Sequence, residues 1–363
     1  MNVPAGEGDI TPAADSGQVL TGAHFIPTLD GWRAVAIGAV IVCHLAVIYT
    51  ENSVFIHLGA QGVALFFAIS GFLITTRLLI EHERSGTIAL RSFYIRRAFR
   101  ILPPALAYLL TLYVLSLLRI LALHHGELVS AIFFFSNYWP DRSWFTAHFW
   151  SLSIEEHFYF MWPAALLLLG PARVKWLAAA VIAGTWIWRP FGVAADPAVP
   201  PFERTDMRLD AFMFACLLAI LMRDRRAGPR LHGILSNPAL RVAVLLSLAI
   251  AYSLAMEFPG WRMVKEAAQS AFIPLLIGGT VARPKDWIGR KLDSAPLKVV
   301  GRLSYGLYLW QELFLTGVIL LNVVSKLVLL FAVVTLSYYG FEKRCMDLGR
   351  RLSGRRGGGL SQG

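Results

Sequence analysis

The sequence has little charge for its length. Only 16% of its 363 residues are Asp, Glu, Lys or Arg, whereas 56% are hydrophobic and the mean hydropathy is +0.57. A soluble domain carries about 25% charged residues, because its surface has to be solvated. This composition excludes an ordinary water-soluble fold and indicates an integral membrane protein.

Cysteine is scarce as well. The three cysteines, Cys43, Cys216 and Cys345, lie in or beside apolar stretches and show no C-x-x-C spacing. Their placement excludes a disulfide framework and a thiolate metal site. We therefore expect no metal in the functional site.

The first residues lack the basic stretch that begins a secretory signal peptide. Residues 1–24 are rich in Ala, Gly and Asp and predict a short disordered cytoplasmic tail. The first apolar stretch is then an uncleaved span. Residues 25–345 are predicted to form one membrane domain, and residues 346–363 to form a basic cytoplasmic tail.

Apolar runs of membrane-spanning length make up most of the chain. At roughly 20 apolar residues per span, there is room for about ten spans joined by short loops. The expected fold class is all-α, a polytopic helical bundle in the membrane. Its spans are predicted at residues 33–50, 58–80, 101–122, 148–169, 174–190, 207–222, 240–257, 267–282, 298–319 and 323–341.

The basic residues are unevenly distributed between the predicted loops. The net charge of +11 comes largely from clusters of Lys and Arg that follow every second span, such as those in residues 84–100 and 223–241. Cytoplasmic loops of membrane proteins are enriched in these residues. Both termini are therefore predicted to be cytoplasmic, in a multi-pass protein of the inner (plasma) membrane surrounded by lipids. The same distribution explains the charge without a nucleic acid partner.

The first predicted span carries two ionisable residues, Arg33 and His44. Eleven positions place them on one helix face, about 16 Å apart. Arg33 falls at the cytoplasmic end, where it can act as an anchor paired with Asp30 or take a functional role. His44 falls past the middle of the bilayer. A buried hydrogen bond between helices is one interpretation of His44, and a general base is the one we favour.

A carboxylate is predicted at the depth of His44. The span that opens with His148 carries Glu155 and Glu156, and Glu155 lies about 10 Å along the helix from its start. These carboxylates can pair with a buried cation such as Arg208. Alternatively, Glu155 orients or charges His44, because a general base works best when a third group fixes its tautomer.

An arginine-rich segment precedes Pro103 and Pro104, which are expected to begin the third span. Guanidinium groups bind phosphate with two hydrogen bonds and stack on aromatic rings, so the segment fits a phosphate-bearing ligand. Anchoring at the cytoplasmic face and binding of anionic lipid head groups are the alternatives. The candidate ligand-binding residues are Tyr94, Arg96, Arg97 and Arg100.

The second predicted span contains a run of aromatic and small residues from Phe66 to Phe72. Small residues let a helix or a slim ligand approach closely. Ser70 is a candidate for ligand binding in this run. A role as nucleophile is not expected, because no base neighbours Ser70 in the sequence and a hydroxyl commonly bonds back to its own helix.

Together these motifs resemble the acyltransferase 3 family of bacterial membrane O-acyltransferases. Residues 29–33 followed by His44 are similar to its R-x10-H signature, and residues 66–74 to its F-F-x-I-S-G-F-L-I run. Residues 92–100 are similar to its R-x-x-R segment, and residues 150–159 to its W-S-L-S-I-E-E-Q-F-Y segment. The resemblance covers about residues 25–348, and the order and spacing of the motifs make it specific.

The resemblance implies transfer of an acyl group, usually acetyl, from cytoplasmic acyl-CoA to a hydroxyl of a glycan, a lipid-linked sugar or a small molecule. It implies that His44 is the catalytic base or acyl carrier, with Arg33 as its motif partner. It also implies that Arg97 and Arg100 contact the CoA phosphates. Whether the protein is a monomer or a homo-oligomer stays open.

Some residues depart from the family pattern, and these departures bear on which acceptor is used more than on whether the protein is active. His157 stands where Gln is common, and Gln311 stands where His is common. Two functions outside this class stay open. One is a proton-coupled carrier or flippase for a lipid-linked sugar or small anion, although no inverted repeat of the transporter kind is evident. The other is a non-catalytic scaffold subunit.

Overall fold

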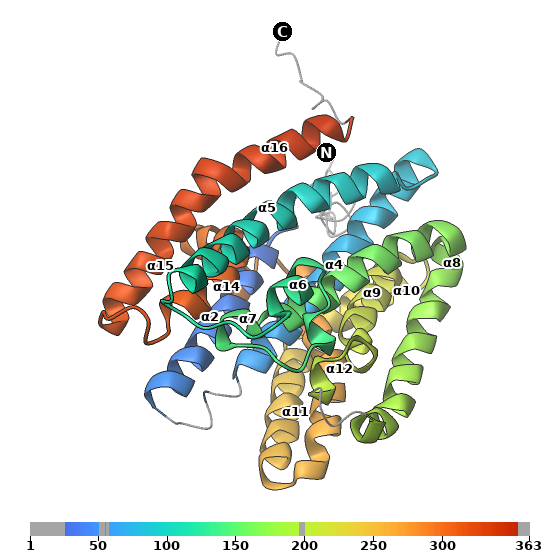
Figure 1. The fold of residues 1–363 in the computed structure, drawn as a ribbon. Coiled ribbons are helices and arrows are strands. Elements are labelled where there is room, and N and C mark those ends of the chain that lie inside the picture. The colour runs from blue at the N-terminus through green and yellow to red at the C-terminus, as the bar shows by residue number, and fades with distance from the viewer. Residues whose placement is uncertain (1–25, 51–54, 56–57, 196–199, 355–363) are drawn as a thin grey trace, which may run out of the picture.

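A computed structural model of the protein describes residues 26–50, 55, 58–195 and 200–354. Within these ranges the chain forms helices and no β-strand (Figure 1), which confirms the all-α prediction. The predicted tail at residues 1–24 and residues 355–363 of the predicted basic tail lie outside the described residues.

The helices follow the predicted spans in order along the chain. The longer ones are α2 (Leu29–Tyr49), α4 (Leu58–Ser85), α5 (Leu90–Leu117), α8 (Phe149–Ala195), α9 (Leu209–Arg223), α11 (Pro238–Glu257), α12 (Arg262–Ala282), α14 (Ala295–Phe314) and α15 (Val323–Ser337). The shorter ones are α6 (Glu127–Ile132), α7 (Trp144–Ala147), α10 (Ala227–Leu235), α13 (Trp287–Leu292) and α16 (Lys343–Leu352). Two predicted spans fall within α8, which is divided by a non-helical residue, Gly170, with a φ of 72°.

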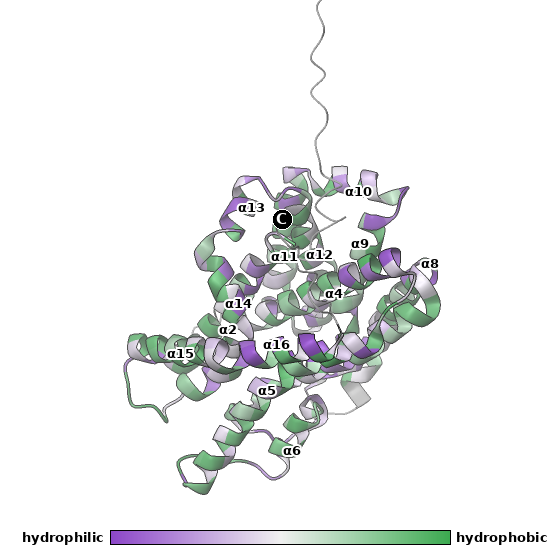
Figure 2. Ribbon diagram, turned by 90° about the horizontal axis from the view of Figure 1, so that it is seen from above, coloured by the Kyte–Doolittle hydropathy of each residue, from purple (hydrophilic) through white to green (hydrophobic). Residues whose placement is uncertain are grey.

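Among the described residues, six helical segments are long and apolar enough to cross a membrane. They are Leu29–Tyr49, Leu58–Ser85, Leu90–Leu117, Trp144–Val193, Pro238–Glu257 and Val323–Leu352. Figure 2 shows apolar residues along most of α5 and α15, and polar residues gathered at α10, α13 and α16. The chain is therefore a helical membrane protein, while the number of ten spans stays a prediction, partly because α9 has only 15 residues.

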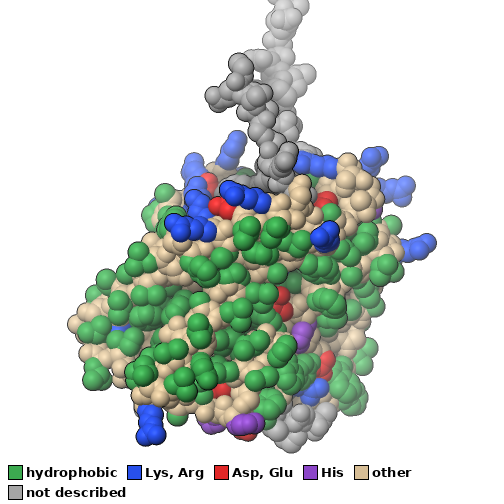
Figure 3. All heavy atoms as spheres, turned by 45° about the horizontal axis from the view of Figure 1, so that its top comes forward, with side chains coloured by type: hydrophobic (Ala, Val, Ile, Leu, Met, Phe, Trp, Pro, Cys, Tyr) green, Lys and Arg blue, Asp and Glu red, His purple; other side chains and the backbone are tan. Residues whose placement is uncertain are grey.

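The basic segments meet at one end of the bundle. Arg223 at the end of α9 pairs with Glu83 at the end of α4. Arg283, which follows α12, donates a hydrogen bond of 3.1 Å to the carbonyl of Ser236, which precedes α11. On the face that Figure 3 shows, most Lys and Arg side chains lie along one rim, above a broad hydrophobic surface. The loops predicted to be cytoplasmic thus share one end, which we call the basic end.

Glycine contacts bring α2 and α14 unusually close together. A Cβ atom added to Gly301 of α14 would lie 1.9 Å from the carbonyl oxygen of Asp30 in α2. Since only glycine leaves room for such an approach, a larger residue would push the two helices apart. The contact is important for the site because α2 carries His44 and α14 carries Glu312.

Helix α5 begins before the prolines that were expected to start it. Pro103 and Pro104 lie in its interior, so that prediction is wrong. A proline in a helix removes one backbone hydrogen bond, and neighbouring contacts can compensate for the loss. Here α16 lies along the first half of α5 (Figure 1), and Gly349 packs against Phe99. The arginine-rich segment is consequently helical.

Candidate active site

A cavity of about 80 Å³ lies between α2, α4, α5, α8 and α14. Its lining combines aromatic rings with charged and hydroxyl groups. Residues from four different sequence motifs therefore converge on one site. The sequence-predicted residues that line it are Arg33, Ser70, Arg97, Arg100 and Glu155.

Two of the predicted ligand-binding residues are not part of this lining. Tyr94 donates its hydroxyl to the carbonyl of Phe160 at 2.7 Å and so links α5 to α8. Arg96 lies near Arg77 of α4, a residue that sequence analysis missed. Arg33 was selected because it is an ionisable residue within an apolar span. The same criterion would have selected Arg77.

The arginines of the cavity differ in how their charge is balanced. Arg33 pairs with Asp30 at 2.6 Å, which confirms the expected pairing. Within the described ranges, neither Arg97 nor Arg100 forms an ion pair with a carboxylate within 4 Å. A partly desolvated guanidinium without a counterion favours an anionic ligand.

Glu155 lies in the arginine-lined part of the site. The hydroxyl of Tyr159 donates to Glu155 at 2.7 Å and lies 2.8 Å from the Ser70 hydroxyl. Arg97 stacks on the ring of Tyr159, with 3.5 Å between the guanidinium carbon and the ring centroid. The carboxylate that was expected to orient His44 therefore contacts a tyrosine instead.

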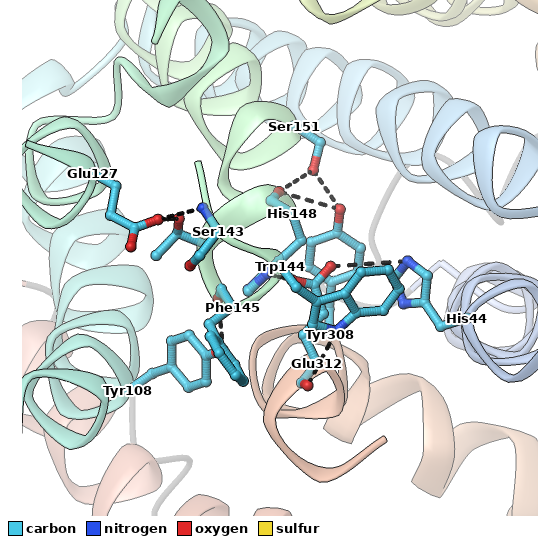
Figure 4. Close-up of polar contacts among 11 residues, drawn as sticks. His44, Tyr108, Glu127, Ser143, Trp144, Phe145, His148, Ser151, Tyr308 and Glu312 are labelled. Carbon is cyan, nitrogen blue, oxygen red and sulfur yellow. Dashed lines mark hydrogen bonds and ion pairs between the residues drawn. The ribbon is translucent and has the colours of Figure 1, made fainter. Parts of the chain in front are cut away.

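The carboxylate beside His44 is Glu312 of α14 (Figure 4). Its Oε1 atom lies 3.8 Å from Nε2 of His44, and its Oε2 atom lies 2.7 Å from Nδ1 of His148. The Glu312 side chain is only 3% exposed. Helix α2, helix α14 and the turn between α7 and α8 thus bring two imidazoles to opposite oxygens of one buried carboxylate, an arrangement that we call the His–Glu–His cluster.

The short helix α7 supports this cluster. The ring of Trp144 packs edge-on against His44, with 5.2 Å between centroids, and its indole donates to the backbone carbonyl of Glu312 at 3.3 Å. Helix α7 itself is held by buried Glu127, which accepts a hydrogen bond of 2.6 Å from the Thr146 hydroxyl. His44 therefore has a defined orientation before any ligand binds.

Two hydroxyl groups connect the cavity to the cluster. Ser151 and Tyr308 both line the cavity, and their oxygens lie 2.6 Å apart. The ring of Tyr308 packs against the ring of His148, with 5.5 Å between centroids. The arginine-lined cavity and the His–Glu–His cluster are thus two adjoining parts of one site.

Glu312 determines which imidazole nitrogens are available. An ionised Glu312 can only accept hydrogen bonds, so its contact with Nδ1 of His148 places a proton on that nitrogen. Nε2 of His44 faces Glu312, while its Nδ1 is buried and has no hydrogen-bond partner among the described residues. A carboxylate at one nitrogen leaves the other nitrogen able to accept a proton, as in a general base.

Sequence reasoning missed Glu312 and His148 as site residues. Both are ionisable residues in apolar stretches and would have met the criterion that selected His44. The alternative in which Glu155 pairs with Arg208 is wrong, because Arg208 pairs with Glu266. No group of three or more side chains suited to hold a metal ion occurs in the part of the chain that the structure describes.

The fold and the site together define a helical membrane protein in which an arginine-lined cavity adjoins a buried His–Glu–His cluster. The chain belongs to the acyltransferase 3 family. The family model, which describes an acyltransferase domain, matches residues 26–341.

Curated relatives agree with this assignment. The chain is 31% identical over 315 residues to a Staphylococcus aureus (strain COL) protein named "Putative O-acetyltransferase SACOL0978", covering 79% of this chain and 50% of the relative. It is 27% identical over 320 residues to the peptidoglycan O-acetyltransferase OatA of Listeria monocytogenes, covering 80% and 50% respectively. The chain therefore spans about half the length of the curated relatives that it matches. No solved structure matches it.

Proposed function

We propose that this chain is a membrane O-acyltransferase that moves an acyl group, acetyl in the simplest case, from acyl-CoA to a hydroxyl of a glycan. One observation carries the proposal: Arg97 and Arg100, which form no ion pair with any described carboxylate, line a cavity that adjoins a base-like His–Glu–His cluster. Similarity to a peptidoglycan O-acetyltransferase favours a cell-wall glycan as acceptor, either polymerised or still linked to lipid.

The donor would bind at the arginine-lined part of the site. Arg97 and Arg100 would hold the CoA phosphates, because charge-assisted hydrogen bonds to phosphate suit the planar guanidinium. Arg33 lines the same cavity and adds positive charge, part of which Asp30 balances. The thioester would then extend past Ser151 and Tyr308 toward His44.

The cluster would supply the base. Nδ1 of His44 takes the proton of the acceptor hydroxyl as the hydroxyl oxygen bonds to the carbonyl carbon of the thioester. The carbon–sulfur bond breaks, and the proton passes from His44 to the departing thiolate. Glu312 stabilises the protonated imidazole of His44, and His148 holds Glu312 in place by its 2.7 Å hydrogen bond.

The same geometry is compatible with acyl transfer through His44 itself. In that course Nδ1 bonds to the carbonyl carbon as the carbon–sulfur bond breaks and the thiolate leaves. The acceptor oxygen then displaces the imidazole, and the proton of the acceptor hydroxyl goes to the released thiolate. Incubation of the protein with radiolabelled acetyl-CoA and no acceptor separates the two courses. Label recovered on a His44 peptide indicates the acyl-histidine course, and unlabelled protein indicates direct transfer.

The proposed function is tested with the purified chain in lipid nanodiscs, radiolabelled acetyl-CoA and a peptidoglycan-derived saccharide. We expect alkali-labile label on the saccharide, as for an O-acetyl ester. The proposal is overturned if the protein neither binds nor turns over acetyl-CoA with any acceptor. Movement of a lipid-linked sugar or anion across sealed vesicles by the same protein would then identify a carrier.

We also propose that the chain crosses the inner (plasma) membrane ten times with its basic end and both termini in the cytoplasm. The basic end supports this orientation, because Lys and Arg are retained on the cytoplasmic side. Arg97 and Arg100, which lie in the half of α5 nearer the basic end, would then face the cytoplasmic pool of acyl-CoA.

Accessibility of single cysteines tests this orientation. In a chain whose three cysteines are replaced by alanine, we expect Asp141→Cys to react with an impermeant maleimide added to intact cells. Lys285→Cys, between α12 and α13 at the basic end, should react only after the membrane is permeabilised. Both positions are exposed in the structure. The reverse pattern would invert the orientation, and the cysteine-free chain measures background labelling.

A further inference from the structure

The guanidinium of Arg97 packs on an aromatic ring, although the more common partner of a buried arginine is a carboxylate. Its guanidinium carbon lies 3.5 Å from the centroid of the Tyr159 ring. Its Nε atom is buried and has no hydrogen-bond partner among the described residues. Glu155 and Glu156 line the same cavity, yet neither pairs with Arg97 within 4 Å in that part of the chain.

The difference between a ring and a carboxylate matters for ligand binding. A carboxylate occupies the N–H donors at the edge of a guanidinium and neutralises its charge. An aromatic ring contacts only the flat face of the cation. Stacking therefore fixes the position of Arg97 while its charge and its in-plane donors stay available.

The ring of Tyr159 is itself held in place. Its hydroxyl donates to Glu155 at 2.7 Å, so the Ser70 hydroxyl, 2.8 Å away, is the donor in the second hydrogen bond. The residue is 3% exposed. Two helices, α4 and α8, thus fix the hydroxyl end of the ring whose face supports Arg97.

We propose that Tyr159 is a positioning residue that holds Arg97 by its aromatic face and leaves the guanidinium edge open to a phosphate of the acyl donor. Glu155 and Ser70 act in this arrangement through Tyr159. The inference rests on the proposed function, because it specifies how the arginine-lined cavity would recognise a donor that bears phosphate.

Fluorination of the ring tests this contact with little change in shape, because fluorine withdraws electron density from the ring face that attracts the cation. Tyr159 is replaced by phenylalanine and by its mono-, di- and trifluorinated forms in the full chain. We expect KM for acetyl-CoA to rise with each fluorine, reaching about tenfold relative to phenylalanine. We expect kcat to stay within about twofold, since the contact serves binding and not the chemical step.

Removal of the ring gives a second test. Tyr159→Leu should raise KM for acetyl-CoA by about tenfold or more, but should leave KM unchanged for S-acetylpantetheine, which lacks the nucleotide phosphates. Phe158→Leu is the matched control. Phe158 is equally buried and stacks on Phe212 at 4.5 Å between centroids, so its loss removes a ring without touching the arginine.

The outcomes separate this inference from the proposed function. A KM that is constant across the fluorinated series overturns the role of Tyr159, as does an equal rise in KM for acetyl-CoA and S-acetylpantetheine. A fall in kcat at constant KM also overturns it, because Tyr159 would then act in the chemical step. If the wild-type protein neither binds nor turns over acetyl-CoA, the proposed function itself fails before any variant is compared.

Discussion

Replacement of Glu312 by glutamine is expected to lower kcat for acetyl transfer by about 10²–10⁴-fold. Glutamine has nearly the shape of glutamate but no charge to stabilise protonated His44, whose Nε2 lies 3.8 Å from the carboxylate. It also weakens the contact that holds His148 at 2.7 Å. KM for acetyl-CoA should change little, because Glu312 lies outside the arginine-lined part of the site. Steady-state transfer to the saccharide measures both constants.

Two other glutamates serve as comparisons. Glu266→Gln removes a buried carboxylate that pairs with Arg208 outside the site, so it should lower the melting temperature and leave kcat near the wild-type value. Glu155→Gln should affect kcat far less than Glu312→Gln. A loss of kcat in Glu155→Gln as large as that in Glu312→Gln would contradict the geometry and restore Glu155 as the partner of His44.

A double variant shows whether Glu312 acts through His44. His44→Ala alone should lower kcat at least as far as Glu312→Gln. Residues that act as a unit are strongly non-additive in their effects. Addition of Glu312→Gln to His44→Ala should therefore cost little more, and a full additional loss would show that the two side chains work independently.

Removal of the arginines at the other part of the site should act on donor binding. A hydrogen bond to a charged group contributes about 1.5–3 kcal/mol, so Arg97→Ala and Arg100→Ala should each raise KM for acetyl-CoA by about 10- to 100-fold. The effect should disappear with S-acetylpantetheine as donor, because that thioester carries no phosphate. Isothermal titration with CoA measures the same loss without turnover.

The matched control for these arginines is Arg91→Ala. Arg91 is exposed near the start of α5, on the same helix, and does not line the cavity. It should leave KM unchanged if the effect is specific to the cavity. An equal rise in KM for acetyl-CoA in all three arginine variants would show that the donor is attracted only by the overall positive charge of the basic end. Salt would then screen that attraction strongly.

The membrane class and the order of the helices could be predicted from sequence because both depend on local composition. Runs of apolar residues identify helices wherever they occur, and the structure places a helix at every predicted span. The start of α5 could not be predicted in this way. Proline usually favours a helix start, but packing of α16 along α5 lets the helix include Pro103 and Pro104.

The candidate site was predictable in part. Motifs identified Arg33, His44 and the arginine-rich segment, and the cavity contains five of the predicted residues. The partner of His44 was not predictable. The rise per residue gives the depth of each side chain along its own helix, but it does not tell which helices are neighbours. Glu155 was chosen for its depth, whereas Glu312 lies beside His44 because α14 packs directly against α2.

The sequence by itself determined that this protein is a helical membrane protein of the acyltransferase 3 family, with a histidine in its first apolar span and an arginine-rich segment before its third. Those properties follow from composition and from the spacing of residues within single helices. The tertiary structure decided that Glu312 lies between His44 and His148 and that Tyr159 supports Arg97. These contacts join distant segments, and they depend on close packing such as that of Gly301 against Asp30, which no local pattern of residues specifies.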